Sequence, residues 1–529
     1  MERSLEARIW LAERLNRPEV TGVRTLDSTW EAWINSSDPV VGQEFFAEAV
    51  AEHQTVLKAF LMDSEASHLV ISVASAEEGL AYLWSALQTG TLSGYRDQLL
   101  VFDSAETLRK MGGGRSDFIA VVYDQKTDAV CQTLNRAMKS IFIRATAEED
   151  GADMVLRPLS DGAMFQLPDH SFELFQDCGG SLTLLHRRWS RFPEQRYPRW
   201  SRDTEKAAGL LVAAMMGQWN AESEWQRSIL MQLTGGKSLK GFEQSFKRGL
   251  KTSDAPVWRY DHVCGVVSKS DIFFSLREAL TPAVLNRFYD TLLTVLQTVW
   301  EEEGDEIGLP KVNRDREAGQ TRHQLMDTAA FFSAHGSFLV KDWCTYDFER
   351  KGTELIQQLL QSLTATKLEQ VGWELSGLAE VGSGALLQIL EADWTSSQSV
   401  IRDLLSEVAV QNNVLQHLFS AMALSAQLSE DDFLKTCRLL AVWWTACPNN
   451  SVRRCEIQTL LKQLFTPGKM GEVPPEHLSQ ALGWMVKTFP GIGRWLCYQL
   501  LVPKDVIVEE SLLSPHWKSG GQREWAEAE

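Results

Sequence analysis

The order of apolar and polar residues divides the chain into a part that contains strands and a longer part with helical spacing throughout. Between residues 51 and 165, helical stretches alternate with short, mainly apolar runs. These runs are Leu69–Val73, Gln98–Phe102, Phe118–Tyr123, Ile141–Ile143 and Met154–Leu156. Because polar and apolar positions do not alternate within the runs, each is expected to be buried on both faces. The pattern predicts a parallel α/β sheet built from βαβ units.

A different order of elements follows. Helical spacing near 204–216, 222–232 and 239–249 precedes an apolar hairpin within residues 257–267. Three helices followed by a hairpin are typical of a winged helix-turn-helix. Pro282 then opens a long amphipathic helix, which ends in a run of acidic residues.

From about residue 320 onward, only helical spacing remains. A loose pattern of a helix followed by proline occurs at Leu434–Pro448 and again, about forty residues later, at Leu478–Pro490. A period of this length fits a helical-repeat array, although a non-repeating helical bundle would produce much the same pattern.

These patterns predict a multidomain chain that is α/β in its first part and mostly α in the rest. The expected divisions are an N-terminal helical segment (1–50), an α/β domain of degenerate nucleotide-binding type (51–200), a winged-helix-like domain (201–303) and an α-helical repeat domain (320–529).

Composition narrows the classes of function. The formal net charge of −18 over 529 residues argues against a general nucleic-acid coat, although a local basic patch remains compatible with binding. The eight cysteines are scattered without a CxxC pair or a zinc-ligand spacing. The N-terminus has no apolar signal core, and no apolar run approaches about 18 residues. We therefore predict a cytoplasmic protein with no metal, no cofactor and no membrane contact.

The strand Leu69–Val73 leads into a turn that resembles a phosphate-binding loop in outline. Such a loop needs glycines and a Lys-Ser/Thr pair at this point. The corresponding positions here are Ser75, Glu77, Glu78 and Gly79. Carboxylates at a helix start stabilise the helix dipole and repel phosphate. We interpret the turn as a phosphate-loop position without working chemistry.

Two further motifs are reminiscent of nucleotide sites. Asp124 follows the apolar strand Ile119–Tyr123, as the carboxylate of a Walker-B strand does, but without a phosphate loop a cap of a helix or turn is the favoured role. The sequence Gly236-Lys237-Ser238 follows a predicted helix, whereas a phosphate loop follows a strand. It is therefore predicted to be a turn between helices.

An arginine- and tryptophan-rich segment is the best candidate binding site. Guanidinium groups can bind phosphates while aromatic rings stack on bases. The alternative, which we favour, is a connector in which arginines pair with carboxylates and aromatic rings pack. The candidate residues are Arg187, Arg188, Trp189, Arg191, Arg196, Arg199, Trp200 and Arg202.

The order of domains resembles the STAND and AAA-like signalling NTPases, most closely large bacterial proteins of anti-phage type. The residues that carry this resemblance are Ser75–Leu83, Gly179–Arg188, Ser270–Pro282 with Phe288, and Ser514–Trp517. The resemblance implies a bacterial defence-type protein. The chain departs from that group because it lacks the usual N-terminal effector and the Gly-Lys-Ser/Thr turn.

Our leading hypothesis is a non-catalytic sensor or scaffold that binds a partner protein through its helical array. A nucleic-acid-binding module that uses residues 187–202 and the winged helix is the first alternative. The second is an NTPase with an atypical phosphate site at Ser75 and the backbone N–H groups near 74–79. Oligomer formation is open under each hypothesis.

Overall fold

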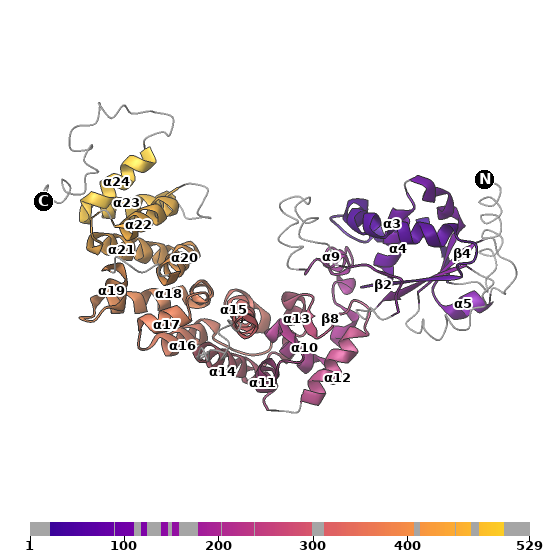
Figure 1. Ribbon diagram of the computed structural model, residues 1–529, viewed down its shortest axis with the longest axis horizontal. Helices are drawn as coiled ribbons and strands as arrows, with labels where there is room; N and C mark the ends of the chain where they lie inside the picture. Colours follow the sequence, from indigo (N-terminus) through magenta and orange to yellow (C-terminus); the bar gives the residue numbers. More distant parts are fainter. Residues whose placement is uncertain are drawn as a thin grey trace. The chain divides into compact units, whose positions relative to one another are not determined.

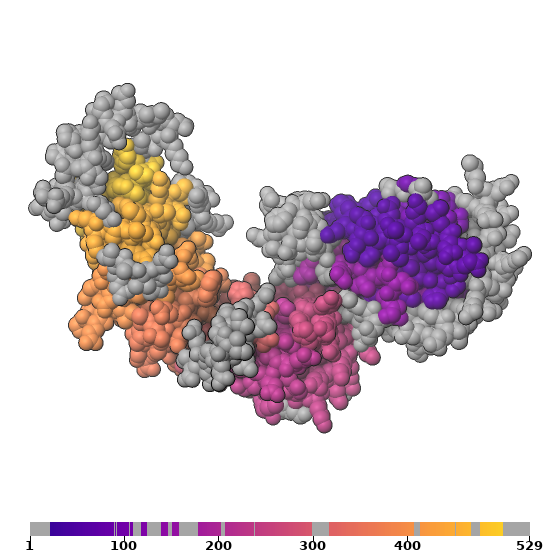
Figure 2. Space-filling view, viewed as in Figure 1, coloured from indigo at the N-terminus to yellow at the C-terminus, as the bar shows by residue number. Residues whose placement is uncertain are grey.

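The computed structural model describes residues 22–88, 90–110, 118–123, 139–145, 151–157, 178–202, 204–236, 239–298, 312–406, 413–449, 451–466 and 475–501. The chain forms two compact units, Met1–Thr281 and Pro282–Glu529. The first unit is coloured from indigo to magenta and the second from pink to yellow (Figure 1, Figure 2). An α/β part and a mostly helical part are thus present, as predicted.

The first unit contains a six-stranded sheet with the strand order β1-β3-β4-β5-β2-β6. Its strands are β1 (Val23–Thr25), β2 (His68–Val73), β3 (Leu99–Phe102), β4 (Ile119–Tyr123), β5 (Ser140–Ala145) and β6 (Met154–Val155). All neighbouring strands from β3 to β6 in this order pair in parallel, which confirms the prediction for them. The sheet is nevertheless mixed, because β1 pairs antiparallel with β3. A strand as short as Val23–Thr25 carries no readable hydrophobic period.

Both faces of the sheet are covered. Leu69, Ile71 and Val73 of β2 belong to the larger apolar core, whereas Val70 belongs to a second core on the other face, as the alternation of side chains along a strand requires. Helices α2 (Leu26–Asn35), α3 (Ala47–Met62) and α4 (Ala76–Ala86) contribute to the larger core. Helix α5 (Ala105–Lys110) lies on the opposite face (Figure 1).

Helix α9 (Leu182–Arg188) follows, and then a second group of elements completes the first unit. The group contains α10 (Thr204–Met216), β7 (Gln218–Asn220), α11 (Glu224–Leu233), α12 (Leu239–Leu250), β8 (Val257–Tyr260), β9 (Val263–Val266) and α13 (Lys269–Ser275). The predicted helices and the β8–β9 hairpin are confirmed. Strand β7 was not predicted, and it pairs antiparallel with β9 to complete a three-stranded sheet.

Short 3-10 helices connect the larger elements of the first unit. They are η1 (Gln43–Phe46), η2 (Gly90–Gln98), η3 (Pro193–Gln195), η4 (Arg199–Arg202) and η5 (Arg277–Ala279).

The described part of the second unit is entirely helical. It contains α14 (Pro282–Gln297), α15 (Val312–Val340), α16 (Phe348–Leu360), α17 (Ala365–Gln370), α18 (Leu375–Thr395), α19 (Val400–Ser406), α20 (Asn413–Leu428), α21 (Glu430–Ala446), α22 (Val452–Leu464), α23 (Pro475–Thr488) and α24 (Pro490–Leu501). Successive helices pack on one another, among them α20 on α21 and α23 on α24. Helix α18 is broken at Gly382, whose backbone is extended.

Within the described ranges, none of the helices combines the length and the apolar character that crossing a bilayer requires.

Candidate functional site

The topology of the sheet marks one place as the natural ligand crevice. From β2 the chain continues to β3 on one side, whereas from β5 it reaches β6 on the other, and β2 and β5 are neighbours. Open α/β sheets bind ligands at the carboxyl ends of strands where the strand order reverses. The turn between β2 and α4, which contains Ser75, therefore lies where a ligand would be expected.

This turn is short. Only Ala74 and Ser75 separate β2 from α4. The Ser75 Oγ accepts the backbone N–H of Glu78 at 3.2 Å and so begins the helix immediately. A phosphate-binding loop places several further residues between strand and helix, whose N–H groups surround the phosphate. The connection is too short to form such a cradle.

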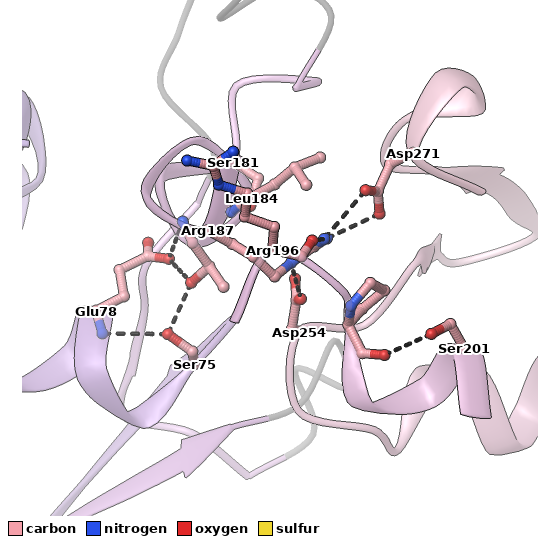
Figure 3. A network of polar contacts seen from close by, with 11 residues as sticks. Ser75, Glu78, Ser181, Leu184, Arg187, Arg196, Ser201, Asp254 and Asp271 are labelled. Carbon is pink, nitrogen blue, oxygen red and sulfur yellow. Dashed lines mark hydrogen bonds and ion pairs between the residues drawn. The ribbon is translucent and has the colours of Figure 1, made fainter. Parts of the chain in front are cut away.

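Glu78 is turned away from the start of its own helix. Its side chain is buried, and its Oε2 accepts the backbone N–H of Thr183 at 3.1 Å and the Thr183 hydroxyl. Thr183 lies in the first turn of α9, whose N-cap is Ser181. The carboxylate thus lies at the positive end of α9 (Figure 3). Of the two acidic residues expected to repel phosphate from α4, Glu78 is instead part of the link between α4 and α9.

Two hydroxyl groups extend this link. The Thr183 Oγ1 lies 2.8 Å from the Ser75 Oγ. Since a hydroxyl has one proton, Ser75 donates to Thr183 whenever Thr183 donates to Glu78. Desolvation raises the pKa of Glu78 to about 7, and the hydrogen bonds from Thr183 oppose that rise. The carboxyl group is therefore poised to change its protonation near neutral pH.

Arg187, near the end of α9, joins this part of the unit to the elements after residue 250. Its Nε lies 2.7 Å from the Asp254 carboxylate, and its Nη1 and Nη2 donate to Asp271 at 3.1 and 2.8 Å. The side chains of Arg187, Asp254 and Asp271 are 10%, 19% and 11% exposed. Such a forked, largely desolvated arrangement is among the stronger polar contacts in proteins. Figure 3 shows the two carboxylates converging on one guanidinium.

Asp254 also contacts the turn itself. It lies in the connection between α12 and β8, and its backbone N–H donates to the Ala74 carbonyl at 2.8 Å. Its φ of 55° is a left-handed conformation that Asp and Asn tolerate better than most residues. Desolvation raises the pKa of its carboxyl to about 7, although Arg187 lowers it. This connection therefore packs against the expected ligand crevice.

A cavity of about 510 Å³ remains beside the turn. His186 lines it and stacks on Trp33 at 3.7 Å, and burial lowers the pKa of the imidazole, which favours its neutral form. Other charged or aromatic lining residues are Arg24, Glu77, Tyr123, Arg187, Glu194, Tyr197, Arg199, Arg202 and Asp254. The cavity therefore has charges of both signs rather than a uniformly basic wall.

The arginine- and tryptophan-rich segment separates into two parts. Arg187 is paired with carboxylates, and the Arg188 Nη2 donates to the Ser270 Oγ at 2.6 Å. Trp189 packs edge-on against Phe45, and Trp200 is only 2% exposed. These contacts fit the connector interpretation, and the burial of Trp200 leaves its ring unable to stack on a base.

The rest of the segment lies at the surface. The exposed arginines and aromatic residues are Arg191, Phe192, Arg196, Tyr197, Arg199 and Arg202, and the acidic Glu194 is exposed between them. Arg196 donates from Nε to the Ser190 carbonyl at 2.9 Å. This exposed part has the residue types that a nucleic-acid surface requires.

Three remaining sequence motifs have different outcomes. Gly79 lies inside α4, where a Cβ would approach the Ile143 Cγ2 to 2.8 Å, so its small size permits close packing of the helix on the sheet. Gly236 lies in the turn after α11, as predicted, and Lys237 and Ser238 lie outside the described residues. Asp124 also lies outside them.

The sequence did not reveal the Glu78–Thr183 and Arg187–Asp271 contacts, whose partners are 105 and 84 residues apart. The residue types of Ser253-Asp254 indicate a turn. Nothing in the local sequence indicates which distant side chain the Asp254 carboxylate pairs with.

Among the described residues, no group of three or more His, Cys, Asp or Glu side chains could hold a metal ion. A scan against protein-family models finds no match to this chain, and a search of curated proteins finds none either.

Proposed function

We propose that this chain is a non-catalytic sensor or scaffold protein of a bacterial defence-type system and that it binds a partner protein through its helical second unit. The first unit would be a degenerate phosphate-loop domain joined to a winged-helix-like domain. The strand order with β2 between β5 and β6 supports the first assignment, and the order α10-β7-α11-α12-β8-β9 supports the second.

One observation carries the non-catalytic part of the proposal. A nucleotide phosphate binds to backbone N–H groups and to a cation. Near the β2–α4 turn, carboxylates of the chain itself already bind groups of both kinds. Glu78 accepts from the N-terminus of α9, and Asp254 pairs with Arg187 while its backbone binds Ala74. A phosphate at the β2–α4 turn would meet no glycine-rich cradle of N–H groups, since only Ala74 and Ser75 separate strand and helix, and Arg187 beside the turn is already held by two carboxylates.

The test is ligand binding by the full chain. ATP, ADP and GTP, each with and without Mg²⁺, should leave its thermal transition unchanged. A nucleotide at about 100 times its Kd would stabilise the folded state by about 2.7 kcal/mol. A clear upward shift with any of the three would favour the NTPase alternative and contradict the proposal.

The partner-binding part of the proposal is supported by a groove in the second unit. A cavity of about 970 Å³ lies beside the break of α18 at Gly382 and is lined by α15, α16, α18, the end of α20 and the start of α21. The carbonyl of Val381 at the break accepts the Ser333 hydroxyl at 3.1 Å. The charged residues of the lining are Asp327, Glu349, Glu380, Asp431, Asp432 and Lys435.

This groove favours a basic partner segment. Acids outnumber the single lysine in its lining, and Lys435 is already 4.0 Å from Asp432. Burial and the neighbouring Asp327 raise the pKa of Glu380, as expected for like charges facing one another. Elsewhere on the second unit, Trp373 is 81% exposed, an unusual state for the residue type most enriched in binding hot spots.

The nucleic-acid alternative keeps one specific support, the exposed arginines and aromatic rings of residues 191–202. Substituting Arg191, Arg196, Arg199 and Arg202 with glutamate should abolish salt-dependent retention of labelled single-stranded DNA and RNA, if the wild-type chain retains either. No retention of the wild type at low salt would dismiss this alternative.

A further inference from the structure

The buried cluster in the first unit has an imbalance of charge. Arg187 is the cation at its centre, and the carboxylates of Asp254, Asp271 and Glu78 surround it or lie nearby. Glu78 and Asp271 both raise the pKa of Asp254 by repulsion, beyond the larger effect of desolvation. Three carboxylates share one guanidinium, so uptake of a proton by Glu78 or Asp254 brings this largely desolvated cluster closer to neutrality.

The cluster also joins separate parts of the unit. Glu78 ties α4 to α9 through Thr183, and Arg187 ties α9 to the α12–β8 connection and to α13. Arg188 adds a second bond from α9 to α13 through Ser270. Breaking the contacts of Arg187 would therefore loosen the attachment of α9 to both later elements.

The turn before α9 is packed closely against one of these later elements. Gly179 has a φ of 59°, and a Cβ built on it would overlap the carbonyl oxygen of Val267. Cys178, the preceding residue, is completely buried. A separation at this contact would expose the Cys178 thiol before the unit unfolds as a whole.

We propose that Arg187, Asp254, Asp271 and Glu78 form a proton-dependent latch, which holds residues 178–188 against the α12–β8 connection and α13 while Glu78 and Asp254 are protonated and releases them when these two carboxyl groups lose their protons. The latch is a two-state element of the kind that sensor proteins use. It does not depend on partner capture by the second unit, so its failure and that of the proposed function are distinguishable.

The surroundings of the latch are consistent with this assignment. No further ion pair to Asp254 is found among the described residues apart from that of Arg187. The other titratable groups that line the adjacent cavity, from β1, α4, β4, α9 and the segment after it, are Arg24, Glu77, Tyr123, His186, Glu194, Tyr197, Arg199 and Arg202. Burial against Trp33 lowers the pKa of His186 and favours the uncharged imidazole. This side chain therefore does not supply the positive charge that the cluster lacks.

The test is alkylation of the full chain with iodoacetamide at about pH 6 and about pH 8.5, with each cysteine followed by mass spectrometry. The rate at each cysteine is divided by its rate in the urea-unfolded chain at the same pH, which removes the effect of thiol ionisation. Cys437 is completely buried in the second unit and serves as an internal control. Cys455 is exposed and reports the upper limit of reactivity.

We expect the normalised rate at Cys178 to be at least about tenfold higher at the higher pH, the size of change that the loss of one coupled proton permits. The normalised rate at Cys437 should stay constant. The double variant Glu78→Gln and Asp254→Asn mimics the protonated cluster and should keep Cys178 protected at both pH values. The single variant Asp254→Asn, which suits the left-handed backbone at this position, should reduce the change.

Three results would overturn the latch. The first is an unchanged normalised rate at Cys178 in the wild type. The second is a rise shared equally by Cys437, which would indicate general unfolding. The third is a double variant with the wild-type dependence on pH. The wild-type measurement decides by itself if a variant does not fold.

Discussion

The backbone N–H of Thr183 donates to the Glu78 carboxylate at 3.1 Å, so an acidic residue in the first turn of α4 binds the first turn of a different helix, α9. This contact converts an apparent barrier to phosphate into an internal link. It also leaves the carboxylate desolvated and dependent on its donors, and several measurable consequences arise from this arrangement.

Replacing Glu78 with alanine should destabilise the first unit. The change leaves the Thr183 N–H without its acceptor at a buried position, which costs about 1–3 kcal/mol. The adjacent substitution Glu77→Ala is the matched control, because Glu77 is exposed and its interaction with the helix dipole contributes less than about 1 kcal/mol. Urea titrations that follow labelling of the buried Cys264 for the first unit and Cys437 for the second should separate the two variants. Equal shifts at Cys264 would contradict a structural role for the Glu78 carboxylate.

Removal of the Arg187 guanidinium should have a larger effect. Arg187→Met leaves Asp254 and Asp271 without their cation, and breaking one side of a largely buried ion pair costs about 3–5 kcal/mol. Arg191→Met, four residues further on at an exposed site, should change the free energy of unfolding by less than about 0.5 kcal/mol.

A double-mutant cycle makes this prediction more specific. If Asp254→Asn is combined with Arg187→Met, the coupling energy should lie at about 0.5–3 kcal/mol. Additive effects of the two substitutions would mean that the 2.7 Å ion pair contributes nothing by itself.

Stability of the first unit should fall as the pH rises through neutrality. Both carboxyl groups have a pKa of about 7 in the folded chain, raised from 4.5 for Glu78 and 3.8 for Asp254. The folded state therefore holds protons that the unfolded state has already lost, and the stabilisation from them is complete below the unfolded pKa values. It is lost by up to about 1.4 kcal/mol per pH unit for each group as the pH rises from the unfolded pKa to about 7, and the loss is complete above that pH.

Urea titrations between about pH 5 and about pH 8.5 test this slope through the transition that labelling of the buried Cys264 reports for the first unit. The double variant Glu78→Gln and Asp254→Asn should have a flatter profile, because its side chains cannot titrate. Stability that increases with pH in the wild type would reverse the predicted sign and reject the raised pKa values.

Two glycines with similar backbones should differ in their response to alanine. Gly179 and Gly236 have φ values of 59° and 71°, so a side chain at either costs about 1–2 kcal/mol from left-handed backbone strain. A Cβ at Gly179 also overlaps the Val267 carbonyl, whereas nothing lies within 4 Å of a Cβ at Gly236. Gly179→Ala should therefore be clearly more destabilising than Gly236→Ala in thermal scans. Equal losses would mean that the close contact with Val267 is absent in solution.

The acidic groove of the second unit should bind a basic peptide through its own charges. We expect the triple variant Asp327→Asn, Glu380→Gln and Asp431→Asn to weaken binding of a fluorescein-labelled oligo-arginine peptide by about tenfold, a loss of about 1.4 kcal/mol. The triple variant Asp342→Asn, Glu369→Gln and Asp403→Asn changes the net charge equally at exposed sites away from the groove lining and should have little effect.

A second substitution tests the shape of the groove without changing its charge. Ala334→Trp places a large ring at an exposed position of the lining. Fluorescence anisotropy should show weaker peptide binding by this variant. Binding that depends only on net charge, with both triple variants equally affected and Ala334→Trp unaffected, would reject the groove as the docking site.

Much of the fold was predictable because its signals are local. The apolar runs at Leu69–Val73 and Ile141–Ile143 predict strands buried on both faces, and those strands pair in parallel. Helical spacing predicts the helices on either side of residue 250 and those of the second unit. The short strands Val23–Thr25 and Gln218–Asn220 were missed, since three residues show no period and both depend on a distant partner strand for their hydrogen bonds.

The candidate site was predictable only in part. The prediction of a phosphate-loop position without working chemistry at the β2–α4 turn stays a prediction, whereas the preference for a connector fits the positions of Arg187 and Trp200. Whether a nucleotide, a nucleic acid or a protein partner binds this chain stays a prediction, as do its cytoplasmic location and its relationship to defence proteins.

The sequence by itself determined where strands and helices form, because hydrophobic periodicity and helix caps act over a few neighbouring residues. Only the tertiary structure decided that Glu78 binds α9, that Arg187 joins Asp254 to Asp271, and that the pKa values of two of these carboxyl groups rise. The reason is physical: the charge and hydrogen-bond partners of a buried group are set by what packs around it, and those neighbours come from remote parts of the chain.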